Sequence, residues 1–172
     1  MTIEAARSAL IAIDLMPRIV SQDMGPHSGA AVVARSAELA TAFRAAGGVV
    51  AAVRVERPGV DEQPPGSGFV PEFTPLPGDI EIVKRTIGAF SRTDLEARLR
   101  DRGVDTVVMA GLATTMGVES TARAAADLGF EVVFAADAMS GVTAGEHTHA
   151  LTVVLPRFGE VLTTAEVLAR LR

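Results

Sequence analysis

The sequence predicts an α/β domain with a mostly parallel sheet and helices on both faces. Short apolar runs rich in Val, Ile and Ala alternate with longer stretches of Ala, Leu, Arg and Glu, as in repeated βαβ units. Most of the short runs are apolar nearly throughout, which is the pattern of strands buried on both faces. At 172 residues the chain has about the length of one domain, so residues 1–172 are expected to form a single one.

The runs and stretches give the expected elements in chain order. Strands are expected at residues 9–14, 49–55, 80–84, 105–111, 131–137 and 159–163. Apolar residues at helical spacing predict helices at residues 30–46, 93–102, 116–128, 144–155 and 165–171. Gly47, Gly103 and Gly129 lie where a helix should end and the chain should turn into a strand.

Three expected helices begin with a threonine that is followed three residues later by glutamate. The pairs are Thr93 with Glu96, Thr143 with Glu146 and Thr163 with Glu166. In such a capping box, the two side chains satisfy backbone N–H groups that the first helical turn leaves without partners. The pairs therefore predict where these helices start.

Residues 57–78 are expected to form a long loop. The stretch holds six prolines and several glycines, which interrupt helices and central strands. Too little chain lies on either side for two cores, so we expect a lid or an oligomer contact rather than a domain linker. This apolar loop and the positive mean hydropathy of +0.31 predict a homo-oligomer, most simply a symmetric dimer.

Composition and charge narrow the class of partner. The net charge of −5 argues against nucleic acid and against an anionic membrane, because both favour a basic face. A small-molecule substrate is therefore expected.

Only five apolar residues in a row precede Asp14, too few for a signal peptide or a membrane span, so the protein is expected to be cytoplasmic. The chain has no cysteine, which excludes disulfides and thiolate nucleophiles.

Polar residues at the ends of the apolar runs are the first candidates for a ligand site, because ligands bind at the carboxyl ends of parallel strands. Asp14 ends the first run, where it could equally cap a turn. Lys84 ends the third and could pair with Asp14 or polarise a substrate carbonyl, although a solvated lysine is the simpler alternative. Asp137 is expected to fix the next turn through hydrogen bonds.

Residues 109–125, MAGLATTMGVESTARAA, give the most specific signal. A strand runs into glycine, then into small and hydroxylated residues, then into a helix, so backbone N–H groups should gather there and favour an anion or oxyanion. The segment matches no dinucleotide-binding or P-loop motif and has no G-x-S-x-G elbow. No base is evident beside the hydroxyls of Thr114, Thr115 and Ser120, which are therefore expected to be structural.

These segments together resemble the isochorismatase-like hydrolase superfamily. The resemblance rests on strand-ending Asp14, KRTIGAFSRTDL from Lys84, and AGLATTMGVESTARAA followed by DAMS after the next strand. It covers essentially the whole chain in the expected order. It implies a doubly wound, mostly parallel six-stranded sheet in the order 3-2-1-4-5-6.

The resemblance also implies the site residues. In the cysteine hydrolases of the superfamily, which include nicotinamidases and carbamoyl-amide hydrolases, an aspartate, a lysine and a cysteine form the triad. These positions fall on Asp14, Lys84 and Gly117, so glycine stands where the cysteine would be. A cis peptide is implied at Leu112–Ala113, with the N–H groups of Ala113 and Gly117 as oxyanion donors.

Thr114 and Phe90 are further candidates for substrate contact, although ordinary packing explains Phe90 equally well. No cofactor or metal is expected. The Asp-x-His metal motif of family nicotinamidases is replaced here by VRVERPG. His147 and His149 are two apart on an expected helix and point in different directions, and His27 lies in a loop, so all three are expected on the surface or in packing.

Without sulfur no thioester can form, so cysteine-type amide hydrolysis is not expected. Isochorismatases proper also carry glycine at this position, and they cleave a vinyl ether: an aspartic acid protonates the enol carbon, and water attacks the resulting oxocarbenium ion. By this resemblance Asp14 is the general acid, with a pKa raised by burial. Because an ammonium lowers the pKa of a neighbouring acid, Lys84 is expected to face the substrate more than Asp14.

Two functions remain open from the sequence. One is a small-molecule hydrolase that acts through Asp14, Lys84 and the loop from Ala113 to Gly117. The other is a ligand-binding or scaffolding pseudoenzyme that has kept the pocket and lost the nucleophile. The retention of both Asp14 and Lys84 favours the enzyme.

Overall fold

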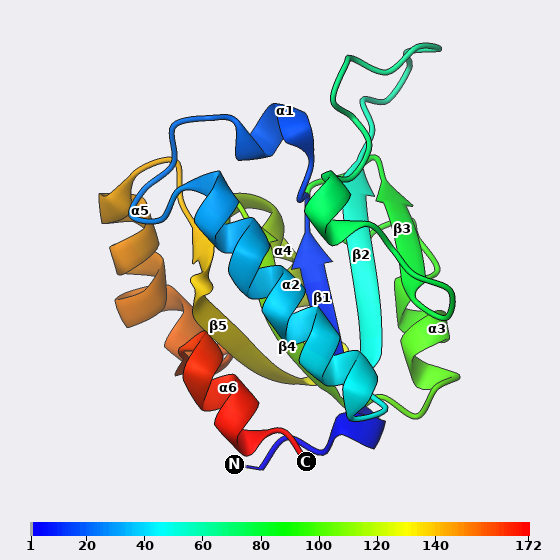
Figure 1. Ribbon diagram of the computed structural model, residues 1–172, viewed down its shortest axis with the longest axis vertical. Coiled ribbons are helices and arrows are strands. Elements are labelled where there is room, and N and C mark those ends of the chain that lie inside the picture. Colours follow the sequence, from blue (N-terminus) through cyan, green and yellow to red (C-terminus); the bar gives the residue numbers. More distant parts are fainter. Residues whose placement is uncertain (1) are drawn as a thin grey trace.

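The computed structural model describes residues 2–172. A six-stranded parallel sheet runs through the molecule in the order β3-β2-β1-β4-β5-β6 (Figure 1). This is the predicted order. The direction of strand addition reverses between β1 and β4, so the loops after these two strands diverge at the carboxyl edge of the sheet. Open α/β sheets bind ligands in the crevice at such a switch point.

The elements have the following bounds. The strands are β1 (Ser8–Ile13), β2 (Val49–Val55), β3 (Ile80–Lys84), β4 (Thr106–Leu112), β5 (Glu131–Ser140) and β6 (Gly159–Leu162). The α-helices are α1 (Pro17–Val20), α2 (Gly29–Ala45), α3 (Leu95–Arg100), α4 (Glu119–Asp127), α5 (Ala144–His149) and α6 (Thr164–Arg170). Shorter or wider helical turns are η1 (Ala5–Arg7), η2 (Pro71–Phe73), η3 (Thr114–Val118), η4 (Ala150–Val154) and η5 (Leu155–Arg157).

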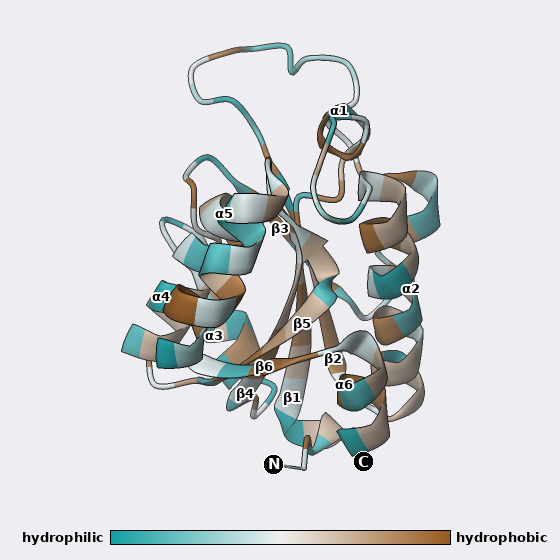
Figure 2. Cartoon of the chain, turned by 90° about the vertical axis from the view of Figure 1, so that its left-hand side faces the viewer, coloured by the Kyte–Doolittle hydropathy of each residue, from teal (hydrophilic) through white to brown (hydrophobic). Residues whose placement is uncertain are grey.

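The sheet separates two apolar layers, and β1 contributes to both. All six residues of β1 are buried. Ala9, Ile11 and Ile13 pack in the cluster that includes α3 and α4, whereas Leu10 and Ala12 pack in the cluster that includes α2 and α6. Figure 2 shows the strands mostly toward the hydrophobic end of the scale, with hydrophilic residues on the outer surfaces of the helices. This packing fixes the carboxyl ends of the central strands.

The helix starts agree with the capping prediction at two of three positions. Thr163 and Glu166 form a complete capping box, and the Thr143 side chain accepts a hydrogen bond from the N–H of Glu146. The box expected at Thr93 is not formed. Helix α3 begins at Leu95, and the Thr93 hydroxyl instead donates to the carbonyl of Ala89 at 2.5 Å.

The loop predicted at residues 57–78 is present and contains only the short turn η2. It rises above the carboxyl ends of β2 and β3 and then returns beside α2 (Figure 1). Val70 and Phe73 anchor the returning part in the apolar cluster of α2. The outer part of the loop therefore stands over the ligand edge of the sheet.

Both described ends of the chain lie at the opposite edge of the sheet. Ile3 bridges to Leu171, and its N–H donates to the carbonyl of Arg170. Within residues 2–172, no helix has the length and apolar character to cross a membrane.

Candidate active site

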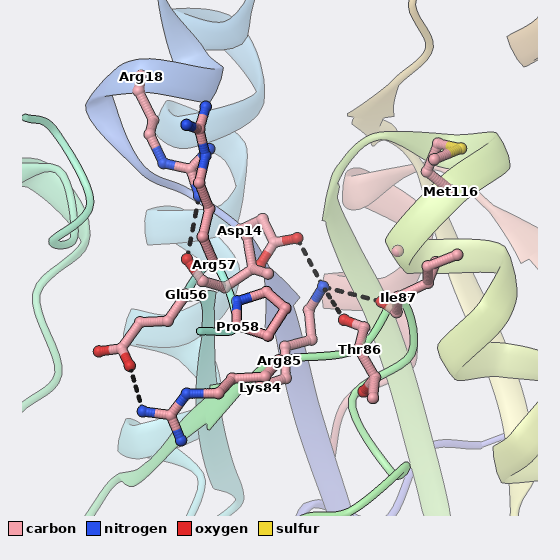
Figure 3. Close-up of a pocket in the computed structure, with 12 residues that line it drawn as sticks. Asp14, Arg18, Glu56, Arg57, Pro58, Lys84, Arg85, Thr86, Ile87 and Met116 are labelled. Carbon is pink, nitrogen blue, oxygen red and sulfur yellow. Dashed lines mark hydrogen bonds and ion pairs between the residues drawn. The ribbon is translucent and has the colours of Figure 1, made fainter. Parts of the chain in front are cut away.

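A cavity of about 360 Å³ opens at the carboxyl edge of the sheet (Figure 3). Its lining comes from the ends of β1, β2 and β3, from α1 and from η3. The lining includes Asp14, Arg18, Arg57, Lys84, Met116 and Gly117. Three of the residues predicted from the sequence, namely Asp14, Lys84 and Gly117, are thus brought together.

Asp14 lies directly after β1, in a left-handed backbone conformation with φ of 55°. Its N–H donates to the carbonyl of Val53 at 2.8 Å, so the hydrogen bonding between β1 and β2 extends to this residue. Few residues other than glycine adopt a positive φ, and those that do cluster at functional sites. The sheet therefore holds Asp14, in its uncommon backbone conformation, at the switch point.

Lys84 forms a buried ion pair with Asp14. Its Nζ lies 2.9 Å from Oδ2 of Asp14, and the two side chains are only 2% and 8% exposed. The ammonium also donates to the carbonyl of Ile87 at 2.8 Å and to that of Thr86 at 3.4 Å. Lys84 is therefore directed at Asp14 and at backbone carbonyls. The expectation that it would face the substrate more than Asp14 is not met.

Burial nevertheless decides the pKa of Asp14. Loss of solvent raises the pKa of this carboxyl above its usual range, and the ammonium of Lys84 and the guanidinium of Arg18 only partly offset that effect. Oδ1 of Asp14 is buried and has no hydrogen-bond partner among residues 2–172. Because Oδ2 already accepts a bond from Lys84, a proton on this acid is placed on Oδ1.

Gly117 faces this pair. A Cβ at position 117 would lie 3.3 Å from Oδ2 of Asp14 and 3.5 Å from Nζ of Lys84, and only 2.9 Å from Cγ2 of Ile13. The backbone of Gly117 is not left-handed. The limited space for a side chain therefore explains the glycine, and the backbone conformation does not. A side chain at this position would point at the ion pair.

The other predicted site residues lie elsewhere or contribute only backbone. The Leu112–Ala113 peptide bond is cis, as the resemblance implies. Among the described residues, neither Ala113 nor Thr114 lines the cavity. Phe90 does not line it either, because its ring packs against Phe130 at a centroid distance of 5.8 Å.

Thr114 instead forms a buried pair that sequence reasoning missed. Its hydroxyl lies 2.8 Å from Nδ1 of His147. The rings of His147 and His27 form a T-shaped pair with a centroid distance of 5.9 Å. Burial, with a smaller contribution from His27, lowers the pKa of His147 from its usual 6.5 to about 4. These residues are too far apart in sequence for a local pattern to reveal the pair.

Arg18 and Arg57 were also missed, although they follow β1 and β2 at the same edge as Asp14. Figure 3 shows Asp14 between Lys84 on one side and Arg18 on the other. Asp14 and Lys84 were identified as polar residues at the ends of strands. The same rule could have identified both arginines had it been extended a few residues beyond each strand.

Asp137 lies inside β5 and holds the start of α6, whereas it was expected from the sequence to fix the next turn. Its Oδ1 accepts hydrogen bonds from the N–H and the hydroxyl of Thr164, at 2.6 and 2.8 Å, at the start of α6. Its Oδ2 lies 3.3 Å from Nε of Arg35.

Across residues 2–172, no group of three or more His, Asp or Glu side chains is arranged to hold a metal ion.

Comparison with known proteins gives consistent matches along the chain. Residues 8–166 match the model of the isochorismatase domain. The uncharacterised isochorismatase family protein YecD of Escherichia coli O157:H7 is 40% identical, over 96% of this chain and 97% of that protein. YwoC of Bacillus subtilis strain 168, also an uncharacterised isochorismatase family protein, is 37% identical over 100% of this chain and 98% of that protein.

Solved structures give the same result. An isochorismatase family protein from Burkholderia thailandensis superposes with a TM-score of 0.90 and is 40% identical, covering 96% of this chain and 95% of that chain.

Proposed function

We propose that this chain, which belongs to the isochorismatase family, hydrolyses a small molecule. Asp14 acts as the general acid, and no cysteine nucleophile takes part. One observation carries the proposal: a carboxyl whose pKa is raised by burial lines the cavity, and its buried Oδ1 has no hydrogen-bond partner among the described residues. A raised pKa favours the protonated form of this acid, and protonation of carbon requires that form.

The chemistry that fits is cleavage of a vinyl ether. Oδ1–H of Asp14 transfers its proton to the terminal enol carbon, and the ether oxygen stabilises the resulting oxocarbenium ion. Water adds to the cationic carbon and loses a proton, which restores Asp14. The hemiketal then collapses to a ketone and an alcohol, so atoms and charge balance.

Lys84 has a role in this scheme that differs from the one expected from the sequence. Its ammonium contacts Oδ2 and interacts more strongly with the carboxylate than with the acid. It therefore stabilises the conjugate base that forms as the proton leaves. Burial favours the protonated form of Asp14 before the reaction, and Lys84 limits the cost of its ionisation in the transition state.

The test is turnover of isochorismate, whose enolpyruvyl ether would release pyruvate on hydrolysis. Wild type is expected to turn it over, and Asp14→Asn to lose at least about a hundredfold in kcat, the lower range for general acid catalysis. Asp61→Asn, at an exposed loop position, is the matched control and should retain activity.

Other outcomes would favour a different function. If wild type hydrolyses neither isochorismate nor a panel of enol ethers and small amides, the second candidate, a ligand-binding or scaffolding pseudoenzyme, is favoured. If Asp14→Asn keeps wild-type turnover, Asp14 is not the general acid.

A further inference from the structure

A buried threonine on α4 connects two segments that line the cavity. The side chain of Thr121 is fully buried and is not part of the cavity lining. Its hydroxyl donates to the carbonyl of Gly117 at 2.6 Å and accepts the N–H of Ala89 at 3.0 Å. Gly117 belongs to η3, whereas Ala89 belongs to the loop at residues 85–94, which joins β3 to α3. One hydroxyl thus ties η3 to this loop.

The same loop holds Lys84. The ammonium donates to the carbonyls of Thr86 and Ile87, the second and third residues after Lys84 (Figure 3). The position of the ammonium therefore depends on the position of the loop. Because Thr121 fixes the loop only a few residues further on, it also restrains Lys84.

Both groups that Thr121 satisfies belong to buried backbone. Ala89 and Gly117 are buried, and a buried backbone group without a partner costs free energy. The loop also packs closely on α4, since an added Cβ on Gly88 would lie 2.7 Å from Oγ of Ser120. The Thr121 hydroxyl donates one bond and accepts another, which serine can reproduce and valine cannot.

We propose that Thr121 is a positioning residue that sets the separation between the backbone of Gly117 and the ammonium of Lys84. The inference rests on the proposed function only in treating Asp14 and Lys84 as the reacting pair. A threonine hydroxyl often bonds to the carbonyl four residues earlier in its own helix. The second bond, to a residue 32 positions away, instead links separate segments. Without it, η3 and the loop can move apart, and small displacements of reacting groups reduce the rate.

A thiol at position 117 measures this separation without requiring turnover. In Gly117→Cys the added Cβ lies 3.5 Å from Nζ of Lys84, so the ammonium should lower the pKa of the thiol. Adding Thr121→Val should raise that pKa by at least about 0.5, because the ammonium moves away. Adding Thr121→Ser should leave it unchanged, because serine keeps the hydroxyl. The pH dependence of alkylation by iodoacetamide measures each pKa.

Thr164→Val is the matched control. Thr164 is 4% exposed, and its hydroxyl donates to Oδ1 of Asp137 at 2.8 Å, so the same change removes a buried hydroxyl that is not part of the link to η3. It should lower the midpoint of thermal unfolding and leave the thiol pKa unchanged. A thiol pKa that does not respond to Thr121→Val, or that rises equally in Thr164→Val, would overturn the positioning role.

A second measurement needs no substitution at position 117. Lys84 is the only lysine of the chain, so labelling with ¹⁵N-lysine gives a single side-chain ammonium signal in NMR spectra. Thr121→Val should shift this signal, whereas Thr121→Ser and Thr164→Val should leave it in place. A signal that stays in place in folded Thr121→Val would contradict the proposal.

Kinetics then separate this inference from the proposed function. With isochorismate as substrate, Thr121→Val should lower kcat about tenfold while KM changes less than about threefold, and Thr121→Ser should restore kcat. If wild type shows no turnover but the thiol pKa responds to Thr121→Val alone, the positioning role stands and the acid mechanism fails. If turnover depends on Asp14 while Thr121→Val changes neither the thiol pKa nor kcat, the mechanism stands and the positioning role fails.

Discussion

At the scale of single residues, Lys84 is unusual because it is the sole lysine among the 16 Lys and Arg residues of the chain. The other cationic positions all carry arginine. At position 84 the side chain is 2% exposed and its ammonium makes three short contacts within a small volume. A compact ammonium satisfies this geometry, whereas a planar guanidinium is larger and presents its donors in a fixed fork.

This placement predicts how pH affects catalysis. Lys84 lowers the pKa of Asp14, so Lys84→Met should raise that pKa further and move the loss of activity at high pH to higher pH. The same variant should lower kcat about a hundredfold, since the nascent carboxylate loses its partner. The pH dependence of kcat/KM for wild type and Lys84→Met measures both effects. A shift of the high-pH limb to lower pH would contradict the assignment of Asp14 as the acid.

Gly117 gives a second prediction at this scale. Gly117→Cys should lower the free energy of unfolding by about 1–3 kcal/mol, because its Cβ approaches Ile13 in a packed layer. The thiol should also ionise below the usual pKa of about 8.5, since Lys84 lies beside it. The pH dependence of alkylation by iodoacetamide measures this ionisation.

The control is Gly145→Cys, at an exposed helical glycine whose added Cβ meets nothing closer than 3.9 Å. Its thiol should titrate near the usual value. If the two thiols have the same pKa, Lys84 does not lower the pKa of a thiol at position 117. Amide hydrolysis that appears only in Gly117→Cys would show that the pocket can serve a cysteine nucleophile.

At the scale of elements, the strands were more predictable than the helices. Fully buried parallel strands require continuous apolar runs, and β2 and β3 have the predicted bounds. The helix expected at residues 144–155 is instead divided into α5, η4 and η5. Pro156 lacks the N–H that would continue an α-helix, and the Thr152 hydroxyl bonds back to the carbonyl of Thr148. These interruptions of the helix depend on single residues, which the spacing of apolar residues does not reveal.

The site was predictable to the extent that it depends on strand ends. Asp14 and Lys84 end apolar runs, and parallel strands bring such ends to one edge. Arg18 lies in the short helix α1 and Arg57 lies in a loop, and the sequence does not specify the direction of either side chain. Thr114 and His147 meet only because η3 and α5 pack together.

The contact between η3 and α5 predicts an acid-sensitive stability. The pKa of His147 is near 4 in the folded protein and near 6.5 when unfolded, so the unfolded chain binds the proton first. The contribution of His147 to the free energy of unfolding is therefore complete above about pH 6.5. It decreases by up to about 3 kcal/mol as the pH drops toward 4. Chemical denaturation from pH 8 to pH 4 measures this loss.

His147→Gln should flatten that part of the pH dependence, whereas His149→Gln, at an exposed position of the same helix, should leave it unchanged. An equally steep loss in His147→Gln would assign the acid sensitivity to other groups. The burial that raises the pKa of Asp14 acts in the opposite direction, and it is common to all three proteins.

At the scale of the whole molecule, apolar side chains are exposed at the rim of the cavity. Ile87 and Met116 are 58% and 53% exposed, and both line the cavity. Val60 is 46% exposed in the outer part of the long loop. Single exposed apolar residues are common on protein surfaces, whereas apolar residues grouped at an opening are more typical of an interface.

The predicted homo-oligomer is therefore expected to form through the rim. Light scattering of wild type should give the mass of a dimer, twice 17.9 kDa. Ile87→Glu should shift the mass toward the monomer, because a dimer that buries this charge loses free energy. Val153→Glu adds the same charge at an exposed apolar position that does not line the cavity and should remain dimeric. A monomeric wild type would remove the prediction, and dissociation by Val153→Glu alone would move the interface away from the rim.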